Sequence, residues 1–163
     1  MPYLIEGLDP APYAPLFALG EEELAQQGAV MMVADEAPGY PCRVSLADAA
    51  PGTRMLLVNH VSRPQQGPYR TSHAIFVSEG AAAAGRFADT APPVFVSRLV
   101  SLRGFDAAGM MVDALLAPPG EADAGLAALF ADPRIVEVDV HTAVRGCFLA
   151  RARRVGSVSH GAI

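Results

Sequence analysis

Two alternating segments near the C-terminus limit the folds that this 163-residue chain can adopt. In residues 134–141 three valines alternate with charged or polar residues, and residues 146–153 alternate between small or aromatic residues and more polar ones. A period of two places one set of side chains on one face of a β-strand and the other set on the opposite face. The two segments therefore predict neighbouring antiparallel strands joined by a short loop.

The apolar faces of these two strands must match, which predicts a register. Pairing Glu137 with Arg151 sets the valines opposite alanine and phenylalanine side chains, and it sets His141 opposite Cys147. A shift by one residue would place a carboxylate against a phenylalanine, which is unfavourable. This register predicts that His141 and Cys147 lie side by side next to a loop that contains Arg145.

Shorter segments predict the rest of the fold. Strands are expected at residues 3–6, 29–34 (buried), 43–46, 54–61, 71–78, 99–102 and 110–116, of which 54–61 and 71–78 form a hairpin. Helices are expected between residues 9 and 20, at 21–27 and at 121–131, and residues 80–93 are expected to be a surface connection. The prediction is a single α+β domain over residues 1–155, with a mostly antiparallel sheet of hairpins, two to three short helices and a flexible tail at 156–163.

Composition excludes several classes of protein. The chain has no apolar run of the ~18 to 20 residues that a membrane-spanning helix requires. Its net charge of −5 argues against a broad nucleic-acid surface, and its first residues lack a secretion signal, so we expect a cytoplasmic protein. The two cysteines, Cys42 and Cys147, are too few for a disulfide framework and are expected to be free thiols.

The residue types also exclude several kinds of site. All twelve basic residues are arginines, which rules out lysine Schiff bases, pyridoxal-phosphate anchoring and a phosphate-loop lysine. The sequence contains no nucleophilic-serine elbow and no dinucleotide-binding glycine motif, so no cofactor is predicted. It also lacks metal-ligand spacings, and no metal is predicted, although convergence of His60, His73 and His141 in space stays open.

Arginines near predicted strand ends are the remaining candidates for a site. Guanidinium groups bind carboxylates and phosphates in a bidentate manner, so a small anionic ligand is the leading hypothesis. The predicted ligand-binding residues are Arg43, Tyr69, Arg70, Ser72 and Arg103. Strand alternation places Ser72 and His73 on opposite faces, which makes Arg70 the strongest candidate of its segment. The alternative is that each arginine pairs with a nearby acidic residue or is solvated.

Two other functions stay open at this point. One is an enzyme in which His141 or His73 acts as general base and Cys147 as a nucleophile. The other is a structural or protein-interaction module, as a monomer or a homodimer, whose polar motifs only shape turns. An ADP-ribosyl-type transferase is a remote option, because no motif of that class is present at the proper spacing.

Five motifs in a fixed order resemble one known family. They are LDPAPYAPLF (8–17), YPCRVSL (40–46), PYRTSHAIFV (68–77), SLRGFDAAGMMVDA (101–114) and DPRIVEVDVHTAVRGCFLARARR (132–154). Together they are similar to the small bacterial proteins of the domain-of-unknown-function family 1203. The resemblance covers nearly the whole chain and implies a compact single domain, but it implies no activity and no catalytic residues.

The chain departs from that family's pattern in the last loop. The family pattern has an asparagine and a proline where this chain has Thr142 and Arg145. This difference weakens any site that depends on the backbone shape of the loop, but it leaves His141 and Cys147 in place.

Overall fold

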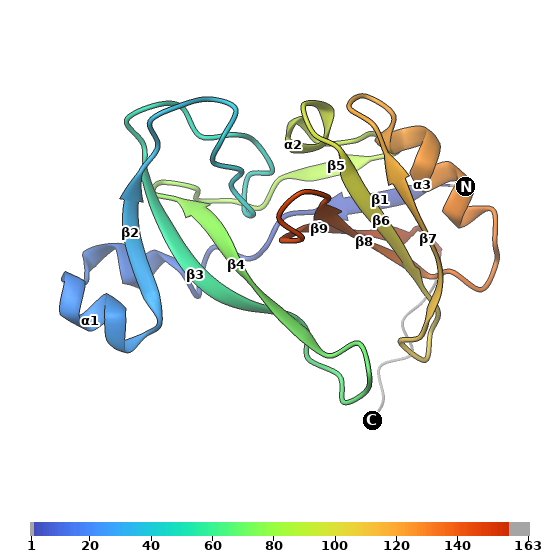
Figure 1. Cartoon of the computed structure of the whole chain (residues 1–163), viewed down its shortest axis with the longest axis horizontal. Coiled ribbons are helices and arrows are strands. Elements are labelled where there is room, and N and C mark those ends of the chain that lie inside the picture. Colours follow the sequence, from blue (N-terminus) through green and yellow to red (C-terminus); the bar gives the residue numbers. More distant parts are fainter. Residues whose placement is uncertain (1, 157–163) are drawn as a thin grey trace.

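The computed structural model describes residues 2–156, and within this range the chain is an α+β protein (Figure 1). One sheet is built from β1 (Tyr3–Glu6), β5 (Arg86–Ala88), β6 (Val100–Phe105), β7 (Met111–Ala117), β8 (Glu137–Thr142) and β9 (Phe148–Arg154). A second sheet is built from β2 (Ala29–Val33), β3 (Arg54–Arg63) and β4 (Thr71–Ser78). The helical segments are η1 (Ala14–Ala18), α1 (Glu21–Gln26), α2 (Pro93–Val96) and α3 (Ala122–Phe130).

Both sheets are antiparallel, and they lie beside one another. The larger has the strand order β5-β1-β9-β8-β6-β7 and the smaller the order β2-β3-β4. Figure 1 shows the long β3–β4 hairpin running from the smaller sheet past the larger one. The predicted single α+β domain with mostly antiparallel strands is confirmed. Among the described residues, no helix has the length and apolar character needed to cross a bilayer.

The larger sheet packs against α3. Leu126, Leu129 and Phe130 fall on one stripe of the helix and are buried against the valines of β8. Gly125 lets the helix approach the sheet closely, because a Cβ at this position would lie 2.6 Å from Leu102 Cδ1. This contact accounts for the position of a glycine inside a helix, where it is otherwise unfavourable.

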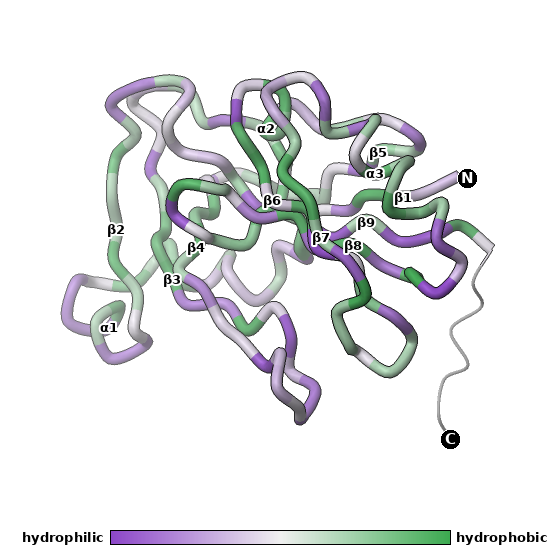
Figure 2. Tube along the Cα trace, turned by 45° about the vertical axis from the view of Figure 1, so that its right-hand side comes forward, coloured by the Kyte–Doolittle hydropathy of each residue, from purple (hydrophilic) through white to green (hydrophobic). Residues whose placement is uncertain are grey.

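The smaller sheet has its own core. Leu24 of α1 and Tyr13 are buried against Val58 of β3 and against Ile75 and Val77 of β4. Farther along the same face, His60 of β3 and His73 of β4 contact Phe148 and His141 of the larger sheet. Figure 2 shows that hydrophobic residues follow β2, whereas the tip of the β3–β4 hairpin is hydrophilic.

Most local predictions are confirmed to within one or two residues, including the β3–β4 hairpin, β1, β7 and α3. Three were wrong. Residues 43–46 form a turn, in which the Leu46 amide donates to the Cys42 carbonyl, and the connection at 80–93 contains β5. The strand at 29–34 is not buried, because β2 is an edge strand and Val30 and Val33 are each 56% exposed. The predicted tail lies outside the described residues, apart from Gly156.

The register predicted for the last hairpin was also wrong, by two residues. In the structure Asp139 lies opposite Arg151, and an irregularity after Val140 brings Phe148 opposite His141. A shift by two preserves the matched faces, so alternation alone cannot distinguish the two registers. The irregularity also turns Phe148 away from the valine face, where it had been expected, and toward the smaller sheet.

Candidate functional site

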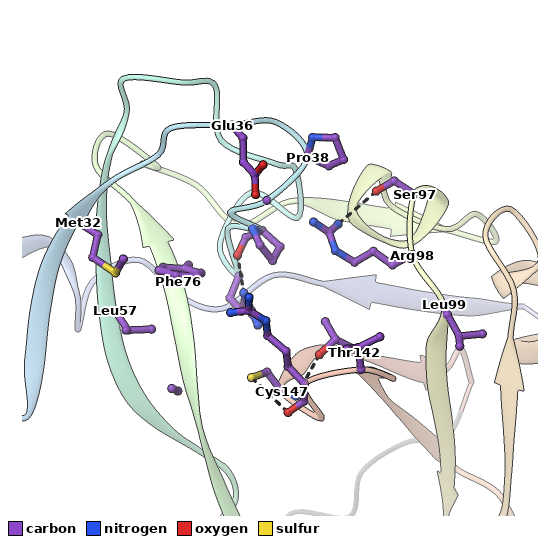
Figure 3. Close-up of a pocket in the computed structure, with 16 residues that line it drawn as sticks. Met32, Glu36, Pro38, Leu57, Phe76, Ser97, Arg98, Leu99, Thr142 and Cys147 are labelled. Atoms are coloured by element: carbon purple, nitrogen blue, oxygen red, sulfur yellow. Dashed lines mark hydrogen bonds between the residues drawn. The ribbon is translucent and has the colours of Figure 1, made fainter.

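Three arginines, Arg43, Arg98 and Arg145, line a cavity between the two sheets. This Arg43 cavity has a volume of about 630 Å³ (Figure 3). One wall is apolar and comes from β2, β3 and β4, with Met32, Leu57 and Phe76. The facing wall contains the polar side chains of Arg43, Arg98, Thr142, Arg145 and Cys147, together with Leu99 and Val144.

Arg43 lies in the turn that follows Pro41. The backbone amide of Arg43 donates a hydrogen bond to the Phe76 carbonyl, which fixes this turn to the edge of β4. Its side chain is 3% exposed. Nε donates to the carbonyl of Phe148 at 2.8 Å, and Nη1 donates to the carbonyl of Pro41 at 2.6 Å. Nη2 makes no hydrogen bond to any described residue, so both of its N–H donors are unused.

Burial also affects the charge of Arg43. Desolvation lowers the pKa of its guanidinium to about 10, so the group is still charged at neutral pH. No carboxylate of the described residues lies within 4 Å of it. Asp48 is close enough to raise the pKa of Arg43 but is bonded to Arg98 through both of its oxygens.

The other polar residues add to the positive character of the cavity. Arg145 is exposed on the β8–β9 loop and forms no ion pair with a described residue. Glu36, on the loop after β2, is the one carboxylate that lines the cavity among the residues described. The half-buried Cys147 thiol lies 3.9 Å from the Arg145 carbonyl, and a negative charge on it would raise the pKa of Arg43.

A second, smaller cavity is lined by several of the other predicted residues. This Arg103 pocket has a volume of about 230 Å³ and is lined by Tyr69, Arg70, Arg103 and His141, together with Thr71 and residues of the neighbouring strands. The structure thus brings together four residues that the sequence analysis selected. Arg43 and Cys147 lie in the other cavity. Ser72 is exposed, accepts a hydrogen bond from Asn59 and lines neither cavity.

The histidines between the sheets are packed rather than solvated. His141 is 2% exposed and donates from Nδ1 to the carbonyl of Gly146 at 3.0 Å. Burial lowers the pKa of His141 to about 4, so it is neutral at pH 7 and Nε2 carries the free lone pair. The His73 ring meets the His141 ring edge to face at a centroid distance of 4.9 Å. His60 instead contacts the Tyr13 hydroxyl and the Phe148 ring.

These positions bear on the enzyme and metal hypotheses. Cys147 and His141 line different cavities, and a histidine with a strongly lowered pKa is a weak general base at neutral pH. In the part of the chain that the structure describes, no three His, Cys, Asp or Glu side chains are grouped to hold a metal ion.

Sequence reasoning missed a group of charged residues that joins the two sheets, here called the Arg63 clasp: Arg63, Glu137, Asp139 and Arg151. Arg63, at the end of β3, donates to Asp139 and to Glu137, each at 2.7 Å. Arg151 also donates to Asp139 and, through Nη2, to the Ser62 carbonyl of β3. Arg63 was overlooked because β3 was expected to end at Val61. The two acids on one face of β8, Glu137 and Asp139, were the available signal for a buried cation.

Comparison with known proteins matches most of the chain to one family. Residues 39–154 match a family model described as "Protein of unknown function (DUF1203)". This segment contains Arg43, Arg98, Arg103 and Arg145. Neither the curated proteins nor the solved structures gave a match to the chain.

Proposed function

The chain belongs to the DUF1203 family, which carries no established activity, and from its own residues we propose that it binds a small organic anion in the Arg43 cavity. The carboxylate or phosphate group of the ligand binds Arg43 and Arg145. Its apolar part lies against Met32, Leu57 and Phe76.

The observation that carries this proposal is the charge of Arg43. A buried guanidinium is costly unless a counter-ion compensates it, and here the described residues supply two backbone carbonyls and no carboxylate. Arg63 and Arg98, which are also largely buried, each have a carboxylate partner. An anionic ligand in the cavity would supply the missing charge at Arg43 and would accept hydrogen bonds from Nη2.

The shape of the cavity supports an organic anion over a free inorganic one. Its volume of about 630 Å³ lies within the range of roughly 300 to 1,000 Å³ that is typical of small-molecule sites. A third cavity, of about 640 Å³, is lined by Glu6 and Asp9 as well as Arg151 and Arg153. Its charges balance, so it offers no comparable attraction for an anion.

The test measures binding of phenylacetate and octanoate by thermal shift and calorimetry. A ligand at about 100 times its Kd adds about 2.7 kcal/mol of stability, which in a chain of this size raises Tm by roughly 5 to 10 °C. Ala74 lies exposed on β4 and lines the cavity, so it accepts substitutions without loss of core packing. Ala74→Glu places a negative charge in the cavity, whereas Ala74→Gln adds the same bulk without charge.

We expect binding in the wild type, a modest change in Ala74→Gln and a loss of at least about tenfold in affinity in Ala74→Glu. Arg145→Gln weakens binding in the same direction, and Arg134→Gln, an exposed arginine far from the cavity, serves as the charge-matched control. Equal affinity in Ala74→Glu and Ala74→Gln would exclude an anion site in the Arg43 cavity.

A further inference from the structure

We propose that the Arg103 pocket is a second anion site, which binds a small tetrahedral oxyanion such as phosphate independently of the organic anion proposed for the Arg43 cavity. The pocket lies where the β3–β4 hairpin passes over β6 and β8. Its volume of about 230 Å³ is below the range typical of organic ligands, which suits a compact anion or the phosphate end of a larger molecule.

Arg103 is the principal group of this pocket. It lies on β6 directly opposite Asp139 of β8, and the two side chains share a face of the sheet. Both oxygens of Asp139 are already occupied by Arg63 and Arg151. Arg103 therefore has no carboxylate of the described residues within 4 Å, and its one side-chain hydrogen bond runs from Nε to Ser101 at 3.3 Å.

The facing side of the pocket adds further donors. Arg70 uses Nη1 to bind the Pro64 carbonyl at 2.6 Å, which fixes the side chain and leaves its other nitrogens without a bond to a described residue. The Tyr69 ring packs edge-on against Phe105 at a centroid distance of 5.5 Å, which holds this residue at the pocket wall. Thr71 contributes a hydroxyl group.

The charge of the surroundings is also suited to an anion. The lining contains three arginines and one carboxylate, Asp139, whose charge is engaged within the Arg63 clasp. His141 and His73 are neutral near pH 7, because burial and the nearby Arg103 lower the pKa of both rings. A phosphate bound to Arg103 would offset the effect of that cation, so the pKa of both histidines is expected to rise on binding.

The experiment follows the histidine ring protons by NMR during titration with inorganic phosphate, with sodium chloride at matched ionic strength as the control for screening. A phosphate monoester forms a second arm, which shows whether the anion is taken free or as part of a larger molecule. We expect saturable shifts of the His73 and His141 signals with phosphate, and none with chloride.

Variants locate the site. Arg103→Gln should weaken phosphate binding at least about tenfold, as expected for loss of a charged hydrogen bond, and Arg134→Gln should leave it unchanged. Because a change at Arg103 could disturb β6, the half-buried Thr71 gives a second test. Thr71→Glu should abolish phosphate binding. Thr71→Gln, which has the same size as the glutamate variant but no charge, should retain it.

Three results would overturn this inference: no saturable shift with phosphate, equal affinity in Arg103→Gln and wild type, or loss of phosphate binding in Ala74→Glu rather than in Arg103→Gln. The last result would place the anion in the Arg43 cavity. Conversely, failure of phenylacetate to bind would exclude the proposed function and leave the phosphate result unaffected, so the two proposals are tested separately.

Discussion

Replacing Asp139 by asparagine should destabilise the protein more than any conservative change of a surface carboxylate. Asp139 is 1% exposed and accepts hydrogen bonds from both Arg63 and Arg151. Asparagine retains the shape of the side chain but removes its charge. The two guanidinium groups then remain largely buried, with Glu137 as the one carboxylate in contact with them among the described residues.

The size of the effect follows from this geometry. Removing one partner of a buried ion pair typically costs about 3 to 5 kcal/mol, because an uncompensated charge stays buried. Glu137 lies 2.7 Å from Arg63 but 3.5 Å from Arg151, so it compensates the first cation better than the second. We therefore expect a loss of about 3 kcal/mol, which is a large share of the roughly 5 to 15 kcal/mol that stabilises a typical domain.

Urea unfolding followed by circular dichroism measures this loss. With a slope of about 2 kcal/mol/M, the midpoint should fall by roughly 1.5 M without a change in slope. Glu79→Gln is the matched control, since Glu79 pairs with Arg54 at 2.6 Å but is 42% exposed. Exposed pairs contribute about 0 to 1 kcal/mol. If Asp139→Asn loses no more stability than Glu79→Gln, the Arg63 clasp does not hold the two sheets together.

Three further predictions concern other parts of the molecule. The pKa of His141 is about 4 in the folded protein and 6.5 in the unfolded chain, so the unfolded state binds more protons below pH 6.5. The free energy of unfolding should therefore fall between pH 7 and pH 5 by about 2 kcal/mol more in the wild type than in His141→Asn. Urea midpoints that fall equally in the two proteins would contradict this. Gly125→Ala should lower the free energy of unfolding by about 1 to 3 kcal/mol despite the higher helix propensity of alanine, because the added Cβ would overlap Leu102. A gain in Tm would refute the close approach of α3 to the sheet. Iodoacetamide should label the half-buried Cys147 in the native protein but the 1%-exposed Cys42 only after unfolding, and mass spectrometry showing equal rates would contradict this burial.

The hairpins were predictable because their signal is local. Alternating residues reveal a strand, and a polar loop between two such segments reveals their pairing, as in β3 and β4. The register of β8 and β9 was not predictable in the same way. Shifts of two residues leave every side chain on its face, and the pairing of Asp139 with Arg151 is stabilised by Arg63, which comes from the other sheet. A local pattern contains no information about such a partner.

The candidate site was predictable in its residue types but not in its grouping. Tyr69, Arg70 and Arg103 meet in one pocket, as the hypothesis of an arginine clamp requires. Arg43 lies in a different cavity, because the turn that carries it packs against the edge of β4 and the start of β9. Where that turn lies depends on how the two sheets meet. The contacts that determine this, above all those of Arg63, connect residues more than 70 positions apart.

The largely buried arginines differ in one respect that bears on function. Arg63 has two carboxylates and Arg98 has one, so the fold compensates both charges internally. Arg43 is at least as buried, but among the described residues its bonds go to carbonyl groups alone. A stable fold by itself would favour an apolar residue or an acidic partner at this position. Departures from the most stable arrangement concentrate at functional sites. The uncompensated charge of Arg43, next to a cavity with an apolar wall, is the observation on which the proposed anion site rests.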